Sequence, residues 1–314
     1  MKAYILRRLL HLIPVLFLTS VIVFLLVYLI PGDPAQTILG PDARPEQLKA
    51  VRQEMGLDKP LPLQYLIWLG RALRGNFGKS FINDYTTLQL ILMKLPVTLD
   101  LTVASFLVAL AISLPLGVLS AIRPRGWINW FSFYYNALAM AVPTFWLGIL
   151  LVLVFGLQLK LLPTSGYVPF FSDPLKALRF LALPAFTLGA YVSAVLARFL
   201  KAALLETLHQ DYVRTARSKG LRERSVITGH ALKNAMIPVV TVLGLQFGAF
   251  MGGAVITEAI FDYPGMGRML LYAILTRDYA VVQGTILFVV TAFVLINLAT
   301  DVVYAFLDPR IRYQ

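Results

Sequence analysis

Six long stretches of this chain carry no Asp, Glu, Lys or Arg, and each is long enough to cross a membrane. An α-helix rises about 1.5 Å per residue, so about 20 apolar residues span the hydrocarbon core. We therefore expect an all-α polytopic membrane protein with six transmembrane helices, forming one domain over residues 1–314. The expected spans cover about residues 9–30, 101–122, 130–156, 180–200, 235–257 and 279–302.

The first span follows a basic leader, which secretory signal peptides also have. Its uncharged run, residues 9–30, is longer than the roughly 7–15 residues of a signal-peptide core. Ile30-Pro31-Gly32 also lacks the small residues of a cleavage site. We expect this segment to be retained as a helix.

The composition agrees with a membrane protein. Hydrophobic residues make up 58% of the chain and charged residues 14%, whereas a soluble domain has roughly 45–50% and about 25%. The chain has no cysteine, which excludes disulfides, a thiol nucleophile and cysteine-ligated metal sites.

The distribution of Lys and Arg predicts the orientation. With a cytoplasmic N-terminus, the inner segments hold 15 of the 28 cations against five acids, and the outer segments hold 13 cations against 11 acids. Because Lys and Arg are enriched in cytoplasmic loops, both termini are expected in the cytoplasm of a multi-pass inner-membrane protein. The net charge of +12 is then explained by topology, and we expect the lipid bilayer, not nucleic acid, as the surface that the cations meet.

Two hydrophilic stretches are long. Residues 31–95 form an expected external loop, in which apolar residues at helical spacing within Gln64–Arg74 predict a surface helix. Residues 201–233 form an expected cytoplasmic loop rich in helix formers and divided by Gly220, which predicts a helix, a break and a second helix.

Small residues mark the fifth span and the segment after it. Gly244, Gly248 and Gly252 recur every four residues, a pattern that predicts close helix packing or exposure to a transport pathway. Beyond the span, Pro264 followed by Gly265 favours a type II turn, because proline fixes φ and glycine accepts a positive φ.

Catalytic chemistry is not indicated. Gly78-Lys79-Ser80 resembles the end of a P-loop, but Gly75 precedes Gly78 by too few residues to wrap a phosphate. The three histidines, His11, His209 and His230, have no metal-binding spacing. None of the six uncharged windows holds the ionisable group that ion-driven carriers commonly use. The sequence thus predicts neither a catalytic nor a metal site, and we expect any energy that the protein uses to come from another protein.

The cytoplasmic loop carries a recognisable motif. Asp211-Tyr212-Val213-Arg214-Thr215-Ala216-Arg217-Ser218-Lys219-Gly220-Leu221, followed by His230-Ala231-Leu232-Lys233-Asn234-Ala235, resembles the conserved loop of ABC importer permeases of the peptide/nickel family, first permease subunit type. Further similar motifs occur in the same order along the chain: Ile30-Pro31-Gly32-Asp33-Pro34, Gly56-Leu57-Asp58, Gly75-Asn76-Phe77-Gly78, Thr257-Glu258, Pro264-Gly265-Met266-Gly267 and Asp308-Pro309-Arg310.

The resemblance implies a type I ABC importer transmembrane domain whose cytoplasmic loop couples to an ATPase. The general importer pattern Glu-Ala-Ala-x3-Gly falls on Arg214, Thr215 and Ala216, so its glutamate and first alanine are replaced here. Attraction of the basic loop to anionic lipid is the alternative interpretation of its cations. The expected ATPase-coupling residues are Asp211, Tyr212, Arg214, Thr215, Ala216, Lys219, Gly220 and Leu221.

The resemblance also implies partners and cargo. It implies a second homologous permease subunit, two cytoplasmic ATPase subunits that bind the ATP, and an extracytoplasmic substrate-binding protein, with no cofactor on this chain. The implied cargo is a dipeptide or oligopeptide, with nickel chelates and glutathione as alternatives within the family. A stand-alone carrier or channel is the rival from another class, and the uncharged windows argue against it.

Overall fold

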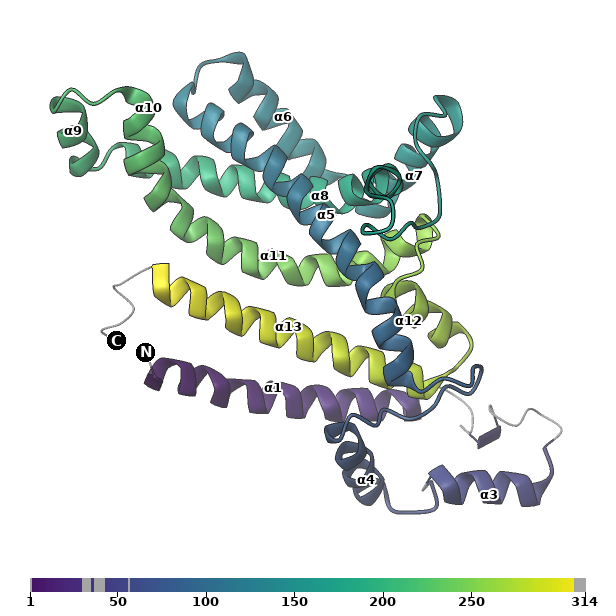
Figure 1. Cartoon of the computed structure of the whole chain (residues 1–314). Helices are drawn as coiled ribbons and strands as arrows, with labels where there is room; N and C mark the ends of the chain where they lie inside the picture. The colour runs from purple at the N-terminus through teal and green to yellow at the C-terminus, as the bar shows by residue number, and fades with distance from the viewer. Residues whose placement is uncertain (1, 30–34, 37–42, 56, 308–314) are drawn as a thin grey trace. The chain divides into compact units, whose positions relative to one another are not determined.

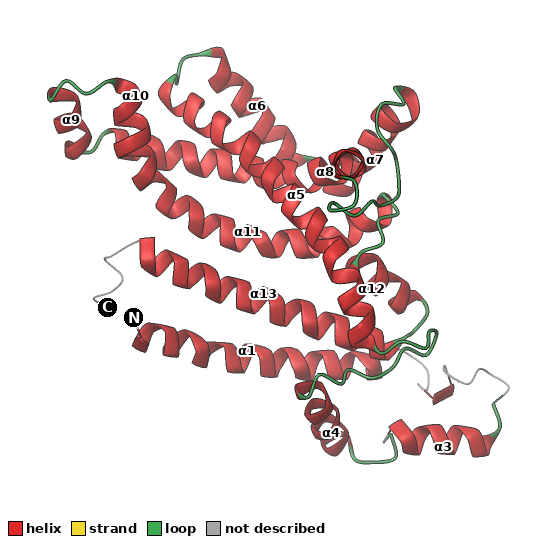
Figure 2. Cartoon of the chain, in the orientation of Figure 1, coloured by secondary structure: helices red, strands yellow, loops and turns green. Residues whose placement is uncertain are grey.

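The structure is a computed structural model that describes residues 2–29, 35–36, 43–55 and 57–307. Within these ranges, only the backbone is described at positions 2–9, 11, 27–29, 50–51, 54–55, 247–249, 251–253, 301 and 303–307. Apart from loops, turns and an isolated β-bridge between Lys79 and Thr86, the described chain is helical, which confirms the all-α class (Figure 2). Its helices are α1 (Lys2–Leu29), α3 (Pro45–Met55), α4 (Leu61–Leu73), α5 (Thr87–Ile122), α6 (Trp127–Ala141), α7 (Thr144–Leu151), α8 (Pro174–Leu208), α9 (Asp211–Ser218), α10 (Glu223–Ser225), α11 (Leu232–Ile260), α12 (Met266–Leu275) and α13 (Tyr279–Leu307), with π-helical segments at Val152–Gln158 and Val226–Ala231.

Several helices are long and apolar enough to cross a membrane. Within the described residues these are Thr87–Ile122, Pro174–Leu208, Glu223–Gln246 and Tyr279–Thr300, and the α6–α7 pair adds a fifth if it is counted as one span. In α1, the apolar stretch whose side chains are described is Leu12–Leu26, which is shorter than these candidate spans. The chain is thus a polytopic helical protein.

Two helices begin well before the uncharged windows. α5 begins at Thr87 and includes Lys94, and α8 begins at Pro174. The start of α8 has a clear local cause: the Asp173 side chain caps the helix by accepting a hydrogen bond from the Lys176 backbone N–H at 3.0 Å. Pro174 occupies the first turn, where its missing N–H costs nothing. Because the windows counted only uncharged residues, they missed these helical extensions.

The third predicted span, 130–156, is not one straight helix. The chain bends by 105° between α6 and the helical stretch Thr144–Gln158, which comprises α7 and the π-helical segment after it. The break lies at Val142, which is extended with φ −80° and ψ 122°, directly before Pro143. A proline disfavours helical backbone at the preceding residue and lacks the N–H that would continue the ladder, so it ends α6 here.

The contacts between residues divide the chain into two compact units. One unit holds Val97–Pro264 and the chain from Leu295 onward, and the other holds Lys2–Pro96 and Gly265–Val294. In the first unit, α8 lies against α6, α7 and α11 (Figure 1). Of its apolar window, 78% is buried, the highest share among the candidate spans of the described residues. α8 is therefore the central helix of this unit.

Small residues let the helices around α8 approach closely. A side chain at Gly189 of α8 would place its Cβ 2.8 Å from the Ser105 carbonyl oxygen of α5. A Cβ at Gly117 of α5 would lie 2.9 Å from the Leu200 side chain of α8. Both glycines are thus required by close backbone approach, which is the common way for membrane helices to associate.

In the second unit, the amphipathic run of the external loop forms α4, as the sequence predicts. Its aromatic face packs on α1: Tyr65 donates or accepts a 2.8 Å hydrogen bond with Ser20, and the Tyr65 ring meets that of Phe24 edge-on at 5.5 Å. Trp68 also lies 5.8 Å from Phe24, centre to centre. α4 therefore packs on α1.

The turn after α11 differs from the predicted type II turn. Gly265 has φ −87°, so it does not supply the positive φ that this turn requires. The positive φ is at Asp262, 50°, and the Tyr263 N–H donates to the Glu258 carbonyl at 2.8 Å. This is a Schellman ending of α11 with an aspartate where glycine is usual. Gly265 instead caps the start of α12.

A buried polar cluster joins the chain around this turn to α5. Thr98 of α5 donates to the Glu258 carboxylate at 2.7 Å, and Glu258 is fully buried. Tyr167 donates to Asp100 at 2.8 Å and its ring packs edge-on against the buried Tyr263.

Burial and the bond to Asp100 raise the pKa of Tyr167 to about 12. Burial likewise raises the pKa of Tyr263. Both hydroxyls therefore stay protonated at neutral pH, and the contribution of Tyr167 to stability is lost only in strong alkali.

The close approach at Gly189 generates a prediction. Gly189→Ala is expected to destabilise the protein by about 1–3 kcal/mol, because the new methyl group meets a backbone oxygen that cannot rotate away. Gly70→Ala in α4 is the control, since a Cβ there meets no atom within 4 Å and alanine favours helix. Thermal unfolding in detergent checks both, and equal unfolding temperatures for Gly189→Ala and the parent would contradict the packing argument.

Candidate functional site

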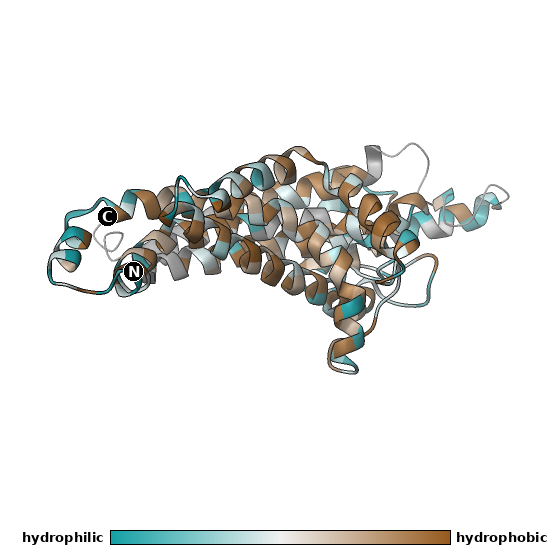
Figure 3. Ribbon diagram, turned by 90° about the horizontal axis from the view of Figure 1, so that it is seen from above, coloured by the Kyte–Doolittle hydropathy of each residue, from teal (hydrophilic) through white to brown (hydrophobic). Residues whose placement is uncertain are grey.

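The predicted cytoplasmic loop is a compact helical hairpin. α8 ends at Leu208, α9 follows, and α10 continues through the π-helical segment Val226–Ala231 into α11. The hairpin lies at one end of α8 and α11 (Figure 1). In the hydropathy colouring it is teal over much of its length, whereas the long helices are mainly brown (Figure 3). The helix, break and helix expected from the sequence are confirmed.

A small apolar core holds the hairpin together. Val213 and Ala216 of α9 are buried and pack against Val226, and Leu208 at the end of α8 joins them. Val213 and Ala216 are three residues apart and so lie on one face of α9. Ala216, one of the expected coupling residues, is thus part of the internal core, not of the exposed surface.

Gly220 ends α9. Its φ is +77°, and its N–H donates to the Arg217 carbonyl at 2.9 Å. A Cβ at this position would meet no atom within 4 Å. Glycine is therefore favoured here by backbone conformation and not by space.

An ion pair crosses the turn at Gly220. Arg217 donates two hydrogen bonds to the Glu223 carboxylate, at 2.7 and 3.2 Å. These bonds raise the pKa of Arg217 and lower the pKa of Glu223. The stabilisation is therefore present at neutral pH and lost as the pH falls through the lowered pKa of Glu223. Since both side chains are about half exposed, the pair contributes about 1 kcal/mol or less.

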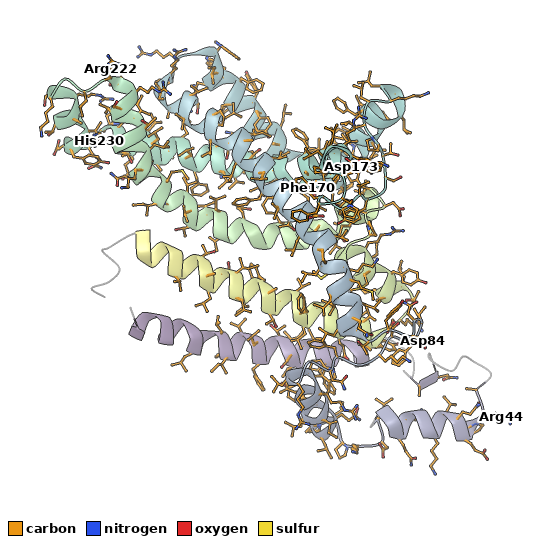
Figure 4. The ribbon with its side chains drawn as sticks, viewed as in Figure 1. Arg44, Asp84, Phe170, Asp173, Arg222 and His230 are labelled. Atoms are coloured by element: carbon orange, nitrogen blue, oxygen red, sulfur yellow. The ribbon has the colours of Figure 1, made fainter. Side chains whose placement is uncertain are left out.

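The outer face of the hairpin is basic with two apolar side chains. Tyr212 and Leu221 are each 43% exposed, and the Tyr212 hydroxyl accepts a 2.8 Å hydrogen bond from Asn234 of α11. Figure 4 labels Arg222 and His230 at this end of the unit. The other expected coupling residues are also exposed: Asp211, Arg214, Thr215, Lys219 and Gly220. An exposed surface of mixed cations and apolar groups, backed by its own core, is suited to docking into another protein.

The glycine stripe of the fifth span is described in part. Gly244 is buried in α11, and a Cβ there would overlap the Thr300 side chain of α13. This contact supports helix packing at Gly244. Gly248 and Gly252 lie further along α11, and their surroundings are outside the described residues.

The sequence analysis missed the buried carboxylate of Glu258. The fifth uncharged window stops at Thr257, directly before it, but α11 continues to Ile260. The uncharged windows hold no ionisable group, but the helices are longer than the windows, and α11 includes Glu258. The Thr257-Glu258 motif was the sequence feature that could have identified this carboxylate. Among the described residues, no group of three or more His, Asp or Glu side chains is arranged to hold a metal ion.

Family models match both parts of the chain. Residues 113–313 match the family described as binding-protein-dependent transport system inner membrane component, and residues 1–102 match its N-terminal membrane component. These matches cover the loop hairpin and the external loop together.

Relatives of the same length are found in bacteria. A protein of Brucella abortus (strain 2308), named as a peptide transport system permease protein, is 42% identical over 314 residues, 100% of both chains. The glutathione transport system permease protein GsiC of Escherichia coli (strain K12) is also 42% identical over 314 residues and 100% of both chains. The resemblance inferred from the motifs is thus confirmed.

A solved structure shares the fold. A chain of the MetNI methionine ABC transporter, in inward-facing conformations, matches with a TM-score of 0.57 at 18% identity, over 70% of this chain and 97% of that chain. This is a permease family without a cofactor, and the ATP is bound by partner ATPases. The chain belongs to the binding-protein-dependent transport system inner membrane components: it is a non-catalytic, multi-pass inner-membrane subunit of an ABC transporter that works with ATPase and substrate-binding partners.

Proposed function

We propose that this chain is the permease subunit of an ATP-driven importer of dipeptides or oligopeptides. The observation that carries the proposal is the 42% identity, over 100% of both chains, to a peptide transport permease. The equal identity to GsiC favours glutathione as the second candidate cargo. We further propose that a second, homologous permease completes the pore and that two ATPases drive it.

The proposed topology has six spans of the type I importer class. They are α1, α5, the bent α6–α7 pair, α8, α11 and α13, and the single permease domain comprises residues 1–314. The excess of Lys and Arg in the segments assigned to the inside supports cytoplasmic termini. In this topology the α9–α10 hairpin is cytoplasmic and the segment around Asn83 is external.

The α9–α10 hairpin is the proposed ATPase-coupling element. The exposed residues Tyr212, Arg214 and Leu221 would contact the ATPase, with Asp211, Thr215 and Lys219 beside them. Ala216 and Gly220 act indirectly, by holding the shape of the hairpin. The basic outer face favours an acidic surface on the ATPase.

The hairpin is built to pass on a displacement. Its core includes Leu208 from the end of α8 and Val226 from the segment that leads into α11. A push on α9 therefore reaches both helices at once, because all three are packed in one apolar cluster. Rigid-body motion of such an element is a common means of domain rearrangement. Gly244 would act in this motion as a close contact between α11 and α13.

Gly220→Val tests the coupling element. Valine at φ +77° costs about 1–2 kcal/mol in backbone strain, and we expect it to distort the hairpin and lower ATP-driven uptake several-fold. Gly220→Asn is the matched control, because asparagine tolerates positive φ. Uptake by the complete assembly in proteoliposomes and co-purification of the ATPase are measured. Full activity of the valine variant would place the coupling element elsewhere.

Thiol labelling tests the orientation. The chain has no cysteine, so Asn83→Cys and Arg222→Cys each introduce a single thiol at an exposed position. In intact cells, an impermeant maleimide is expected to label the Asn83→Cys variant and not the Arg222→Cys variant, and to label both after lysis. The reverse pattern would invert the topology.

Uptake competition tests the cargo. In proteoliposomes that contain the complete assembly, ATP-dependent uptake of a labelled dipeptide is expected to be reduced by unlabelled dipeptides and tripeptides. Competition by glutathione alone would support the second cargo. Uptake without ATP and without the ATPase subunits would refute the importer and support a stand-alone carrier.

A further inference from the structure

Helix α4 has two apolar faces, and α1 covers one of them. Tyr65 and Trp68, three residues apart, lie on the covered face and contact α1 (Figure 1). Leu63, Leu66 and Leu73, at spacings of three and seven, share a second face and are 45%, 61% and 80% exposed. We call these three residues the leucine face. An exposed apolar face of this kind marks a contact with lipid or with another protein.

The contacts between α4 and α1 lie within the apolar part of α1. The Tyr65 ring lies 6.3 Å from the ring of Phe17 and 5.5 Å from that of Phe24, centre to centre. Between them, the Tyr65 hydroxyl is 2.8 Å from the Ser20 hydroxyl. The uncharged run of α1 begins at residue 9 and ends at residue 30, and about 20 residues are needed to cross the hydrocarbon core. Every placement of such a span within this run includes all three contact residues of α1, so the Tyr65 side chain lies at the depth of the hydrocarbon.

Helix α13, in the same compact unit, gives the same level. The Gln283 side chain donates to the backbone carbonyl of Phe24 at 3.4 Å, so these two positions lie at one depth. Gln283 is the fifth residue of α13, and the window Tyr279–Thr300 holds no charged residue. α4 thus meets α1 at a level that lies inside the apolar windows of both long helices.

After α4, the chain returns to the start of α13. Phe77 packs against Gly284, where an added Cβ would lie 2.8 Å from the Phe77 Cβ. Three residues later, Ser80 donates a hydrogen bond to Asp278, directly before α13. Gly284 and Asp278 are six residues apart, a rise of about 9 Å along a helix. The chain therefore climbs from the level of α4 to the edge of the apolar window, and α4 is the deeper part of this segment.

The sequence of α4 is that of an interfacial helix. Its uncharged run from Pro60 to Gly70 has 11 residues, which is too short to span a membrane but within the roughly 10–14 residues of interfacial or re-entrant segments. Exposed cations flank the run, with Lys59 before it and Arg71 and Arg74 after it. Such side chains reach the lipid headgroups while the helix itself lies in apolar surroundings.

The remaining face of α4 is polar. Gln64 and Arg71 are seven residues apart and so share a face, which is neither the leucine face nor the face on α1. The Gln64 side chain donates to the Lys59 carbonyl at 2.7 Å. A helix with one face on the protein, one apolar face and one polar face fits the membrane boundary, where the apolar face meets acyl chains and the polar face meets headgroups and water.

We propose that α4 is an interfacial membrane helix whose leucine face is embedded in the acyl chains of the outer leaflet. The bond between Tyr65 and Ser20 ties it to α1, because water that could satisfy these hydroxyls is scarce at this depth. The external stretch that contains α4 is thereby anchored to lipid as well as to α1. The inference rests on the proposed topology, in which α1 and α13 are spans, and the choice of the outer leaflet follows from the proposed orientation.

The level of α4 favours lipid over a protein partner. A water-soluble binding protein stays outside the hydrocarbon and does not reach this depth. At the same level α1 exposes Leu18, Ile22 and Leu25, which are 60%, 51% and 42% exposed and share one face of that helix. Apolar surface is thus exposed on both neighbouring helices, as expected where a membrane protein faces acyl chains. A second permease subunit would have to cover both helices at once.

Nitroxide labels test the surroundings of the leucine face. The chain has no cysteine, so Leu66→Cys gives it a single labelling site, and Leu63→Cys repeats the measurement on the same face. Ile22→Cys on α1 is the membrane control and Gln53→Cys, at an exposed position of α3, is the aqueous control. Each variant is studied in the complete assembly in lipid bilayers, and the assembly with the parent chain gives the background. Electron paramagnetic resonance measures how often the label collides with oxygen, which concentrates in acyl chains, and with a water-soluble nickel chelate.

We expect oxygen collisions to exceed nickel collisions several-fold at Leu66, Leu63 and Ile22, and the reverse at Gln53. Nickel collisions at Leu66 as frequent as at Gln53 would place the leucine face in water and overturn the proposal. Rare collisions with both reagents at Leu66 would show that protein covers this face, as a second permease subunit would, and would also overturn it. Aqueous exposure of Ile22 would overturn the proposed topology together with this proposal. The measurement needs no ATP or cargo, so failed uptake with a lipid-exposed Leu66 would refute only the proposed function.

Discussion

Close packing around α8 is the constraint on which the larger unit depends. In a membrane, helices do not gain from excluding water from each other, so they associate where small residues let their backbones approach. Gly189 and Gly117 provide such contacts between α5 and α8, and a Cβ at either position would collide with its neighbour. α8 then continues to Leu208, at the base of the α9–α10 hairpin. Packing in the membrane thus fixes the anchor point of the proposed coupling element.

The hairpin uses a different stabilising principle, because it is exposed to water. Its small core of Val213, Ala216 and Val226 excludes water and ties α9 to Leu208 of α8. The Arg217–Glu223 pair bridges the turn at Gly220 and adds little stability. A rigid hairpin with an uncommitted outer face can follow the motion of an ATPase without losing its own structure.

The buried polar cluster belongs to neither of these elements. Glu258 accepts a hydrogen bond from Thr98, and Tyr167 donates to Asp100, so α11 and the loop before α8 are each linked to α5. Buried hydrogen bonds of this kind fix one arrangement of the helix ends, because an unpaired carboxylate in apolar surroundings is costly. The strained Asp262 turn next to Glu258 is held in place by the same group of contacts.

The sequence alone determined the helical class, most of the apolar segments, the broken loop at Gly220 and the family, since hydropathy and short motifs are local in the chain. Tertiary structure decided what depends on distant partners. Only the fold places Ala216 in a core, Glu258 against Thr98, and Tyr167 against Asp100. The fold also decided the size of the bend at Pro143, because a proline in a membrane helix is compatible with either a kink or a full break, and it decided the turn at Asp262. The neighbouring helices determine which of these outcomes occurs, and their positions in space cannot be read from the spacing of residues along the chain.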